Sequence, residues 1–416
     1  MRLIHTADWH LGHSLYGVSR RFEHQRFLDW LLERLQAVEA DALLVAGDIF
    51  DSTNPPASAF ALFYGFLTEA RRRMPGLDLI LIGGNHDSAA RLEAPSSLFQ
   101  ALGIRVIGGL ARTPDGEPDV QRLLCPLHDR QGRVAGHCVA VPFLRNSDLP
   151  PADPAGAGDP LIEGVRARYR FLFDAARGLR RPGQALVAMG HCYMVRGRVS
   201  ELSERRILGG NQHALPVDLF PPGVAYAALG HLHLAQAVDA EGRIRYSGSP
   251  IPLSLDEADY PHQVVQVDLE GERLVDAVAL PVPRSVPILR LPETGPAPLE
   301  QVIEALERLQ PDPDCPVERR PYLELRVRLE RPQPGLRETL EARCRDLPLR
   351  LLRVSSHYTG TADPLAETVP RQRLEELDPE QVFSRCYQAA HKGPPPDELL
   401  SCYRELLEQV QQAEPD

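Results

Sequence analysis

Five short apolar runs share one kind of ending, and no other pattern in the chain says as much about its fold. The runs occupy residues 3–7, 42–47, 79–84, 185–190 and 224–230, and each leads directly into Asp, Asn or His. Continuous apolar runs of this length, four of them closed by glycine, are typical of strands buried on both faces of a sheet. In open α/β sheets, ligands bind beyond the carboxyl ends of the strands. We therefore expect an α/β fold in which the five endings converge on one site.

The side chains at these endings offer only oxygen and imidazole nitrogen. The predicted metal ligands are Asp8, His10, Asp48, Asn85, His191, His231 and His233. Such donors suit Mn²⁺, Fe²⁺, Zn²⁺ or Mg²⁺, whereas the seven scattered cysteines show no thiolate motif. Seven ligands are too many for one ion and fit two ions that share a bridging carboxylate. Residues i and i+2 of an extended segment lie on the same side, which explains the pairs Asp8/His10 and His231/His233.

Two catalytic residues are expected within this set. Asp48 is the predicted bridge between the ions, and His86, next to ligand Asn85, is the predicted donor of a proton to the leaving oxygen, oriented by Asp87 or a nearby group. Two bound ions would activate water and neutralise the charge that develops on a phosphate group. Any one of these residues alone would more often be structural; their joint occurrence favours a metal site. His5, inside the first strand, is expected to be structural.

Strands and helices alternate over residues 1–110, which predicts parallel pairing with right-handed crossovers. Helices are expected at 22–38, 55–73 and 94–102. A further amphipathic helix is expected at 161–179, with its arginines on a solvated face. Residues 111–142 carry the turn signals of a hairpin at the edge of a sheet. The catalytic domain is expected to span residues 1–283.

A smaller capping domain with a role in DNA recognition is expected over residues 284–362. The sequence there has a β-α-β-α-β pattern and lacks clustered metal ligands. Residues 363–416 predict two amphipathic helices, near 379–390 and 396–412. The second helix has an apolar stripe, which would dock either on the parent fold or on the helices of a partner.

The overall charge and the missing motifs restrict the function further. A net charge of −11 argues against a protein that coats nucleic acid indiscriminately. No apolar run is long enough to cross a membrane, so a cytoplasmic protein is expected. The chain has no phosphate-binding loop for ATP, so any ATP dependence must come from another subunit. Weaker candidates for DNA contacts are Arg196, Arg198, Arg205, Arg206 and Ser249.

The order Asp8-x-His10, Gly47-Asp48, Gly84-Asn85-His86-Asp87, Gly190-His191 and Gly230-His231-x-His233 resembles that of the calcineurin-like metallophosphoesterases. The stretches 5–12, 45–51 and 246–254 are similar to those of the SbcD family, the nuclease subunits of bacterial SbcCD complexes. The resemblance implies a two-sheet sandwich flanked by helices, with a smaller α+β capping domain and terminal helices. It also implies two divalent ions, usually Mn²⁺, one held by Asp8, His10, Asp48 and His233 and the other by Asp48, Asn85, His191 and His231. His86 matches the catalytic histidine of the family.

The same resemblance implies a substrate and partners. Members of the family degrade double-stranded DNA ends in the 3′ to 5′ direction and open hairpins in DNA repair, recombination and replication, driven by an SbcC-type ATPase. A homodimer within a heterotetramer or larger complex is implied. Two alternatives stay open: a phosphodiesterase or phosphatase that acts on a small molecule, and a DNA-end binding scaffold whose metal site is not catalytic.

Overall fold

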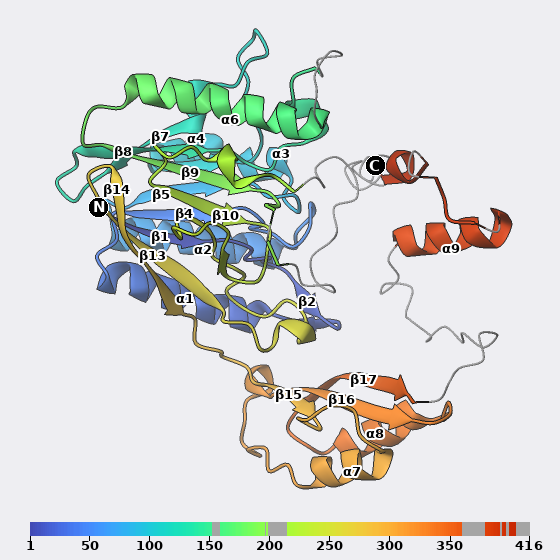
Figure 1. Ribbon diagram of the computed structural model, residues 1–416. Coiled ribbons are helices and arrows are strands. Elements are labelled where there is room, and N and C mark those ends of the chain that lie inside the picture. The colour runs from blue at the N-terminus through green and yellow to red at the C-terminus, as the bar shows by residue number, and fades with distance from the viewer. Residues whose placement is uncertain are drawn as a thin grey trace. The chain divides into compact units, whose positions relative to one another are not determined.

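The computed structural model describes residues 1–151, 159–195, 197–198, 214–359, 379–391, 393–396 and 399–404. The chain forms two compact units, Met1–Arg284 and Ser285–Asp416, which are coloured blue to yellow and yellow to red in Figure 1. No helix in the described ranges combines the length and the apolar character that a membrane span requires. The larger unit contains two six-stranded sheets and is called the sandwich unit; the smaller one is called the cap unit.

The first sheet of the sandwich unit has the order β14-β13-β1-β4-β5-β6. Its parallel part consists of β1 (Arg2–Thr6), β4 (Ala42–Ala46), β5 (Asp78–Ile82) and β6 (Ile104–Ile107). The antiparallel pair β13 (Gln263–Glu270) and β14 (Arg273–Pro281) extends it beside β1. The three strands predicted here from their polar endings are therefore confirmed, and their carboxyl ends share one edge of the sheet.

Helices α1 (Arg21–Ala37) and α2 (Ala57–Arg73) lie on the outer face of this sheet, where Phe27, Phe63 and Phe66 meet β1, β4 and β5 in one apolar core. Both helices agree with the sequence prediction within two residues at each end. The predicted helix 94–102 corresponds to α4 (Ser96–Ala101), and a further short helix that was not predicted, α3 (Ala89–Glu93), precedes it. Pro95 interrupts the pair, because proline cannot supply a backbone N–H within a helix.

The second sheet has the order β11-β12-β10-β9-β8-β7. Its strands are β7 (Leu124–His128), β8 (Val134–Ala140), β9 (Ala185–His191), β10 (Tyr226–Gly230), β11 (Gln236–Ala237) and β12 (Ile244–Tyr246). The predicted hairpin is the antiparallel pair β7–β8, which forms the edge of this sheet. Helix α6 (Pro160–Leu179) packs against it, with Tyr169, Leu172 and Phe173 buried. The short hairpin β2 (Ser14–Leu15) and β3 (Val18–Ser19) and the one-turn helix α5 (Val120–Leu123) complete the unit.

The two sheets pack face to face and close most tightly at the ends that carry the predicted ligands. A Cβ placed on Gly230 of β10 would lie 1.9 Å from the carbonyl oxygen of Ala46 in β4. A Cβ on Gly84 would lie 2.1 Å from Oδ1 of Asp48. Glycine is therefore required at both positions, since no side chain fits between the strand ends. The predicted two-sheet sandwich flanked by helices is confirmed.

The cap unit is built on a parallel three-stranded sheet of order β15-β16-β17. Its elements in chain order are β15 (Ile288–Leu291), α7 (Leu299–Glu307), β16 (Tyr322–Leu329), α8 (Leu336–Cys344) and β17 (Arg350–Tyr358). Both helices lie on the same side of the sheet, as Figure 1 shows. Val302 and Leu306 of α7 and Leu340 of α8 form one core with the leucines of β16.

Helix α9 (Pro379–His391) corresponds to the first predicted terminal helix. Residues 399–404 are helical as well, and the rings of Phe383 and Tyr403 stack with centroids 4.2 Å apart. Arg404 forms an ion pair with Glu380 at 2.6 Å. The remainder of the predicted second helix lies outside the described residues.

Candidate metal centre

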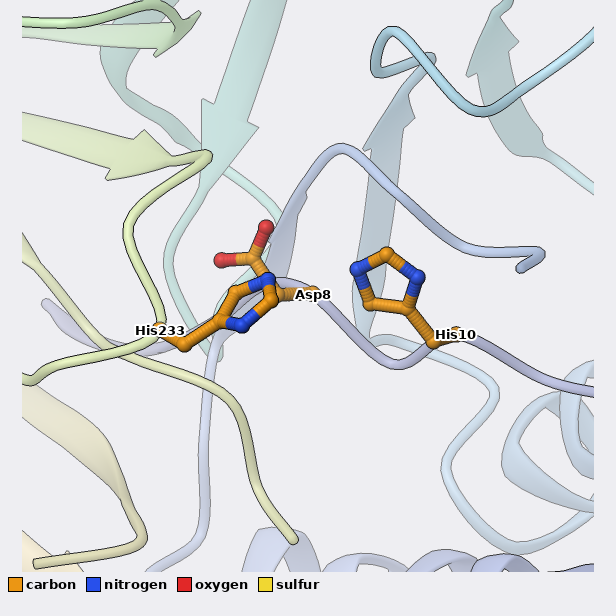
Figure 2. A group of neighbouring side chains, drawn as sticks. All are labelled: Asp8, His10 and His233. Carbon is orange, nitrogen blue, oxygen red and sulfur yellow. The ribbon is translucent and has the colours of Figure 1, made fainter. Parts of the chain in front are cut away.

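The polar residues that follow five parallel strands meet where the two sheets approach each other. Asp8 and His10 follow β1, Asp48 follows β4, and Asn85 and His86 follow β5. His191 ends β9, and His231 and His233 follow β10. Figure 2 shows three members of this set, Asp8, His10 and His233, gathered at the loops after β1 and β10. The structure therefore brings together every residue that the sequence predicted as a metal ligand.

The backbone at these strand ends is strained. Asp8, His10 and Asp48 have φ angles of 54°, 47° and 47°, and His231 has a φ of 104°. Non-glycine residues rarely adopt the left-handed region, and such conformations cost of order 1–3 kcal/mol each. Strain of this kind clusters at functional sites, where it directs side chains to a common point.

One group of possible ligands consists of Asp8, His10 and His233, which offer three atoms within 4.8 Å of one another. Asp8 Oδ1 accepts a hydrogen bond of 2.9 Å from the backbone N–H of His231. Asp8 Oδ2 and His10 Nε2 are buried and make no hydrogen bond within the described chain. Buried polar atoms without partners are unfavourable unless an ion or a water molecule satisfies them. These atoms fit a divalent cation.

Asp48 lies between this group and a second one. Its Oδ2 atom is 3.6 Å from Nε2 of His10 and 3.3 Å from Nε2 of His191. Its Oδ1 atom accepts a hydrogen bond of 2.9 Å from the backbone N–H of His86. The combinations His10/Asp48/His86 and Asp8/Asp48/His191 also bring their ligand atoms within 4.8 Å. A carboxylate that lies within 3.6 Å of ring nitrogens from both sheets has the position that a bridging ligand requires.

Asn85 joins the histidines of the second sheet. Its Oδ1 atom is 2.9 Å from Nε2 of His191 and 3.3 Å from Nδ1 of His231. His191 Nδ1 is 2.9 Å from the carbonyl oxygen of Ala46. This contact orients the ring and leaves Nε2 directed at Asn85 and Asp48, as in a histidine that binds a metal through Nε2.

The outer contacts of the site involve two acidic residues that the sequence analysis did not identify. His233 Nδ1 lies 2.8 Å from Glu257 Oε1, and His10 Nδ1 lies 3.2 Å from Asp51 Oδ1. Carboxylates in such positions hold ligand histidines in the correct tautomer and raise their basicity. Asp51 is three residues after Asp48, and this proximity was a usable signal. Glu257 is 24 residues after His233, and nothing in the sequence connects the two.

The contacts of His86 decide between Asp87 and a nearby group as the partner that orients it. Its Nδ1 atom is 2.8 Å from the backbone oxygen of Asp51, so Asp51 and not Asp87 orients the ring. The carboxylate of Asp87 accepts hydrogen bonds from the backbone N–H groups of Ile49, Phe50 and Gly84 at 2.9–3.0 Å. Asp87 therefore ties the loop after β4 to the loop after β5, which is a structural role.

Burial and mutual charge shift the pKa values at the site in opposite directions. Burial raises the pKa of Asp8 to about 6, although His191 and His233 oppose the rise. Burial also opposes ionisation of Asp48, but His191, His86 and His10 outweigh it and hold its pKa well below the ordinary range. Burial acts to lower the pKa of His191, but Asp48 outweighs it and raises that pKa to about 9, whereas burial lowers the pKa of His231 to about 3. Of the two carboxylates among the predicted ligands, Asp48 is thus ionised more readily than Asp8, as a bridging ligand must be.

Two of the five weaker DNA-contact candidates lie within the described residues. Arg198 is exposed, and its backbone N–H and carbonyl both pair with the side chain of Gln236. Ser249 is buried, and its backbone N–H donates to the carbonyl oxygen of His233 at 3.0 Å, so it supports a ligand and presents no surface. Arg196, Arg205 and Arg206 lie outside the described residues. His5 is structural as expected, because its ring nitrogens lie 2.9 Å from the hydroxyl of Tyr226 and 3.1 Å from the carbonyl oxygen of Leu229.

Two family models match the chain. The model of the calcineurin-like phosphoesterases matches residues 1–235, which include all the strand-end ligands. A model described as the Type 5 capsule protein repressor C-terminal domain matches residues 284–391. Each match falls within one of the two compact units, apart from one residue at their boundary.

The chain is also similar to named proteins over nearly its whole length. It is 44% identical over 390 residues to the D subunit of nuclease SbcCD from Rhodobacter capsulatus, covering 93% of this chain and 94% of that protein. It is 32% identical over 396 residues to the protein of the same name from Escherichia coli K12, with 92% of each chain covered. The corresponding protein of Bacillus subtilis is 34% identical over 283 residues, which cover 64% of this chain and 66% of that protein.

Proposed function

The chain belongs to the SbcD family of calcineurin-like phosphoesterases, which makes it a metal-dependent phosphodiesterase with a nuclease role, and we propose that it cleaves DNA with two divalent metal ions as the partner of an SbcC-type ATPase. The proposed activities are 3′ to 5′ degradation of double-stranded ends and opening of hairpins. Mn²⁺ is the proposed metal, ahead of Mg²⁺, Fe²⁺ and Zn²⁺. The proposal places the complex in the cytoplasm and the chain in a homodimer within a heterotetramer or larger assembly.

The observation that carries the two-metal proposal is the shared position of Asp48. Asp8, His10 and Asp48 each belong to two of the three ligand groups, but the Asp48 carboxylate also lies within 3.6 Å of ring nitrogens from both sheets. In the proposed assignment, Asp8, His10, Asp48 and His233 hold one ion, and Asp48, Asn85, His191 and His231 hold the other. Oxygen and imidazole donors, with no cysteine among them, fit hard and borderline divalent ions.

Two bound ions supply an activated water nucleophile and neutralise charge on the phosphate that is attacked. The protein supplies orientation and a proton. His86 is anchored through Nδ1 to the backbone oxygen of Asp51 and through its backbone N–H to Asp48, and it is the proposed donor of a proton to the departing oxygen of the DNA. Asp51 and Glu257 contact the Nδ1 atoms of His10 and His233, respectively, and so fix the orientation of both rings.

The cap unit supports a role in DNA recognition through the face of its sheet that is turned away from α7 and α8. Side chains alternate between the two faces of a strand. The leucines and the valine of β16 face the core with α7 and α8, so the residues that alternate with them lie on the opposite face. Strand pairing sets Arg290 and Arg353 beside Glu324, and Arg350 beside Tyr322. The basic face, as we define it, consists of Arg290, Arg326, Arg328, Arg350 and Arg353.

Two arginines of the basic face share an acidic neighbour. Glu324 lies 3.5 Å from Arg290 and 3.7 Å from Arg353, and it is 5% exposed. The guanidinium of Arg350 lies 4.2 Å from the ring centroid of Tyr322. Arg326 and Arg350 donate to backbone carbonyl oxygens, and Arg328 is exposed. A face lined by arginines fits the phosphates of a nucleic acid, to which arginine binds through its planar set of donors.

The C-terminal helical segments are the proposed site of the ATPase partner. Leu399 on the second segment is 40% exposed, although Phe383 and Tyr403 join the two segments. Deletion of residues 364–416 is expected to abolish the complex with the ATPase while Mn²⁺ binding is kept. Co-purification and calorimetric metal titration measure the two effects, and an intact complex after the deletion would contradict this part of the proposal.

The first test of the nuclease function is Mn²⁺-dependent cleavage of an end-labelled DNA hairpin, by the isolated chain and by the chain with the ATPase subunit and ATP. We expect cleavage by the wild-type protein and its loss in His86→Gln, because the leaving oxygen then lacks its proton donor. Asp115→Asn, at an exposed acidic position in a turn, serves as a control for loss of charge alone. Cleavage that survives both His86→Gln and Asp48→Asn would overturn the proposed site.

A comparison of substrates separates this function from the two alternatives. A small-molecule phosphodiesterase would turn over bis(p-nitrophenyl) phosphate far better than DNA. A non-catalytic scaffold would bind DNA tightly and cleave neither substrate. The nuclease proposal requires that DNA is the better substrate by kcat/KM.

A further inference from the structure

The segment that leaves β8 lies at the edge of the metal centre, although it contributes none of the proposed ligands. The backbone N–H of Phe143 donates to the carbonyl oxygen of Gly83, in the turn that carries Asn85 and His86, at 2.9 Å. The ring of Phe143 meets the ring of His191 edge to face, with centroids 6.3 Å apart. Phe143 therefore contacts a proposed ligand of the second sheet and the turn that carries a ligand of the first.

Arg145, two residues after Phe143, places its guanidinium at the same edge of the metal centre. Its Nη2 atom donates to the backbone oxygen of Asp87 at 3.3 Å, and its Cζ atom lies 5.9 Å from the centroid of the Phe143 ring. Contacts with an aromatic face and a carbonyl oxygen leave the cation without an opposite charge. Within the described ranges, no carboxylate forms an ion pair with Arg145.

The loop that carries Arg145 is firmly anchored. Its backbone N–H donates to Asp148 Oδ2 at 2.8 Å. The same carboxylate lies 3.8 Å from Arg112, and the carbonyl oxygen of Asp148 accepts a bond of 2.8 Å from Arg168 Nε. Arg168 is buried, which corrects the expectation that the arginines of α6 all lie on a solvated face. These contacts fix the position of Arg145, and Asp148 is balanced by Arg112.

We propose that Arg145 binds the DNA phosphate next to the one that is cleaved, with Phe143 as the platform that holds its guanidinium. The inference rests on the proposed nuclease function. An arginine has five N–H donors in a planar set that matches a phosphate group. One of them is occupied by the carbonyl oxygen of Asp87, and the others remain for a ligand beside His86. Arg145 thus distinguishes a polynucleotide, which has a neighbouring phosphate, from a simple diester, which has none.

A kinetic test compares two substrates for the full-length chain in Mn²⁺. Arg145→Ala is expected to lower kcat/KM for a DNA hairpin about ten- to a hundredfold, as for loss of a hydrogen bond between charged groups. The fall for bis(p-nitrophenyl) phosphate is expected to be at most about threefold. Arg145→Lys keeps the charge and is expected to recover part of the DNA activity. Arg170→Ala, an exposed arginine on α6, is the matched control.

Equal losses on both substrates would overturn the proposal, because Arg145 would then act on the scissile group or on folding. Equal activity of Arg145→Ala and Arg170→Ala on DNA would overturn it as well. Phe143→Leu is expected to lower DNA turnover less than Arg145→Ala does, since the guanidinium keeps its bond to Asp87.

A second test needs no metal and no turnover. DNA binding is measured in EDTA by fluorescence anisotropy over a range of salt concentrations. Removal of one phosphate interaction with a duplex reduces the slope of log K against log salt by about 0.9. Arg145→Ala is expected to show this reduction, and an unchanged slope would contradict the proposal. A wild-type protein that binds DNA but cleaves neither substrate would contradict the nuclease function, and the slope would still decide the role of Arg145.

Discussion

The sandwich unit and the cap unit both join parallel strands through helices, yet they place their polar residues differently. In the sandwich unit, all five residues of β4 are buried, because one face of its sheet meets α1 and α2 and the other meets the second sheet. Polar side chains then reach a ligand where the strands end, and one inside a strand, such as His5, is buried and bonded within the protein. In the cap unit, α7 and α8 lie on one face, and the strands carry arginines on the other.

This difference shows how the covering of a sheet decides where its chemistry lies. A strand buried on both faces can present side chains only at its carboxyl end, where a few residues from several strands meet at short distances. Such a place suits metal ions. A strand with one face turned away from the helices presents every second residue over its whole length, and such a surface suits an extended, repeating ligand.

The largest effect is expected from a change that separates the two sheets of the sandwich unit. Gly230→Ala is expected to lower its free energy of unfolding by about 3 kcal/mol or more, because the new Cβ would lie 1.9 Å from the carbonyl oxygen of Ala46. The two tryptophans, Trp9 and Trp30, both belong to this unit, so their fluorescence in urea reports on it alone. In Gly223→Ala, where the added atom meets nothing within 4 Å, little change is expected. Equal stability of the two variants would contradict the close packing of the strand ends.

A second change tests whether metal binding at the strand ends depends on a carboxylate that orients one of the ligands. Glu257→Gln is expected to weaken Mn²⁺ binding about 10–100-fold, because the carboxylate 2.8 Å from His233 Nδ1 orients this ligand. Calorimetric titration of the metal-free chain measures the effect. Asp256→Asn changes the exposed neighbour and is the control. Unaltered metal affinity in Glu257→Gln would mean that His233 is not a ligand.

A third prediction uses pH to distinguish the units. Burial lowers the pKa of His5 in the sandwich unit to about 3 from 6.5, so its unfolded form binds a proton more readily than its folded form. The contribution of the neutral His5 ring to the free energy of unfolding is therefore fully present above pH 6.5 and is lost as the pH falls toward 3. For this one group the loss is about 2 kcal/mol between pH 7 and pH 5. In His5→Gln, the loss over that interval is expected to be smaller by this amount, as measured by tryptophan fluorescence in urea. His357→Gln changes an exposed histidine of the cap unit and is expected to leave the loss of stability between pH 7 and pH 5 unchanged.

The smallest effect is expected on the basic face. Arg328→Ala is expected to lower DNA affinity a few fold and to reduce the salt slope of binding by about 0.9, without an effect on cleavage of bis(p-nitrophenyl) phosphate. Arg308→Ala, at the end of α7 on the opposite side of the sheet, is the control and is 80% exposed at its side chain. Equal slopes in the two variants would show that the face does not contact phosphates.

Much of the site was predictable because its signal is local. Asp48, Asn85 and His191 each lie at the end of a buried strand, and parallel strands place their ends at one edge whatever the rest of the chain does. The helices over 22–38 and 55–73 were predictable for the same reason, since their apolar periodicity is contained within each segment. The helix over 94–102 was predicted as well, but the five-residue helix α3 before Pro95 was missed, because it is too short to show a periodic apolar pattern.

The sequence by itself determined the buried strands and their polar endings and predicted the ligand set and a division into a catalytic region and a C-terminal region, because short-range patterns encode which residues are buried and where strands end. The two-sheet sandwich was implied by the resemblance to the calcineurin-like metallophosphoesterases. Only the tertiary structure decided which atoms support the ligand set. Glu257 reaches His233, Asp51 and not Asp87 orients His86, and Phe143 brings Arg145 to the loop of Asp87. These contacts join residues whose separation along the chain carries no signal, since they depend on how two sheets and their loops pack against each other.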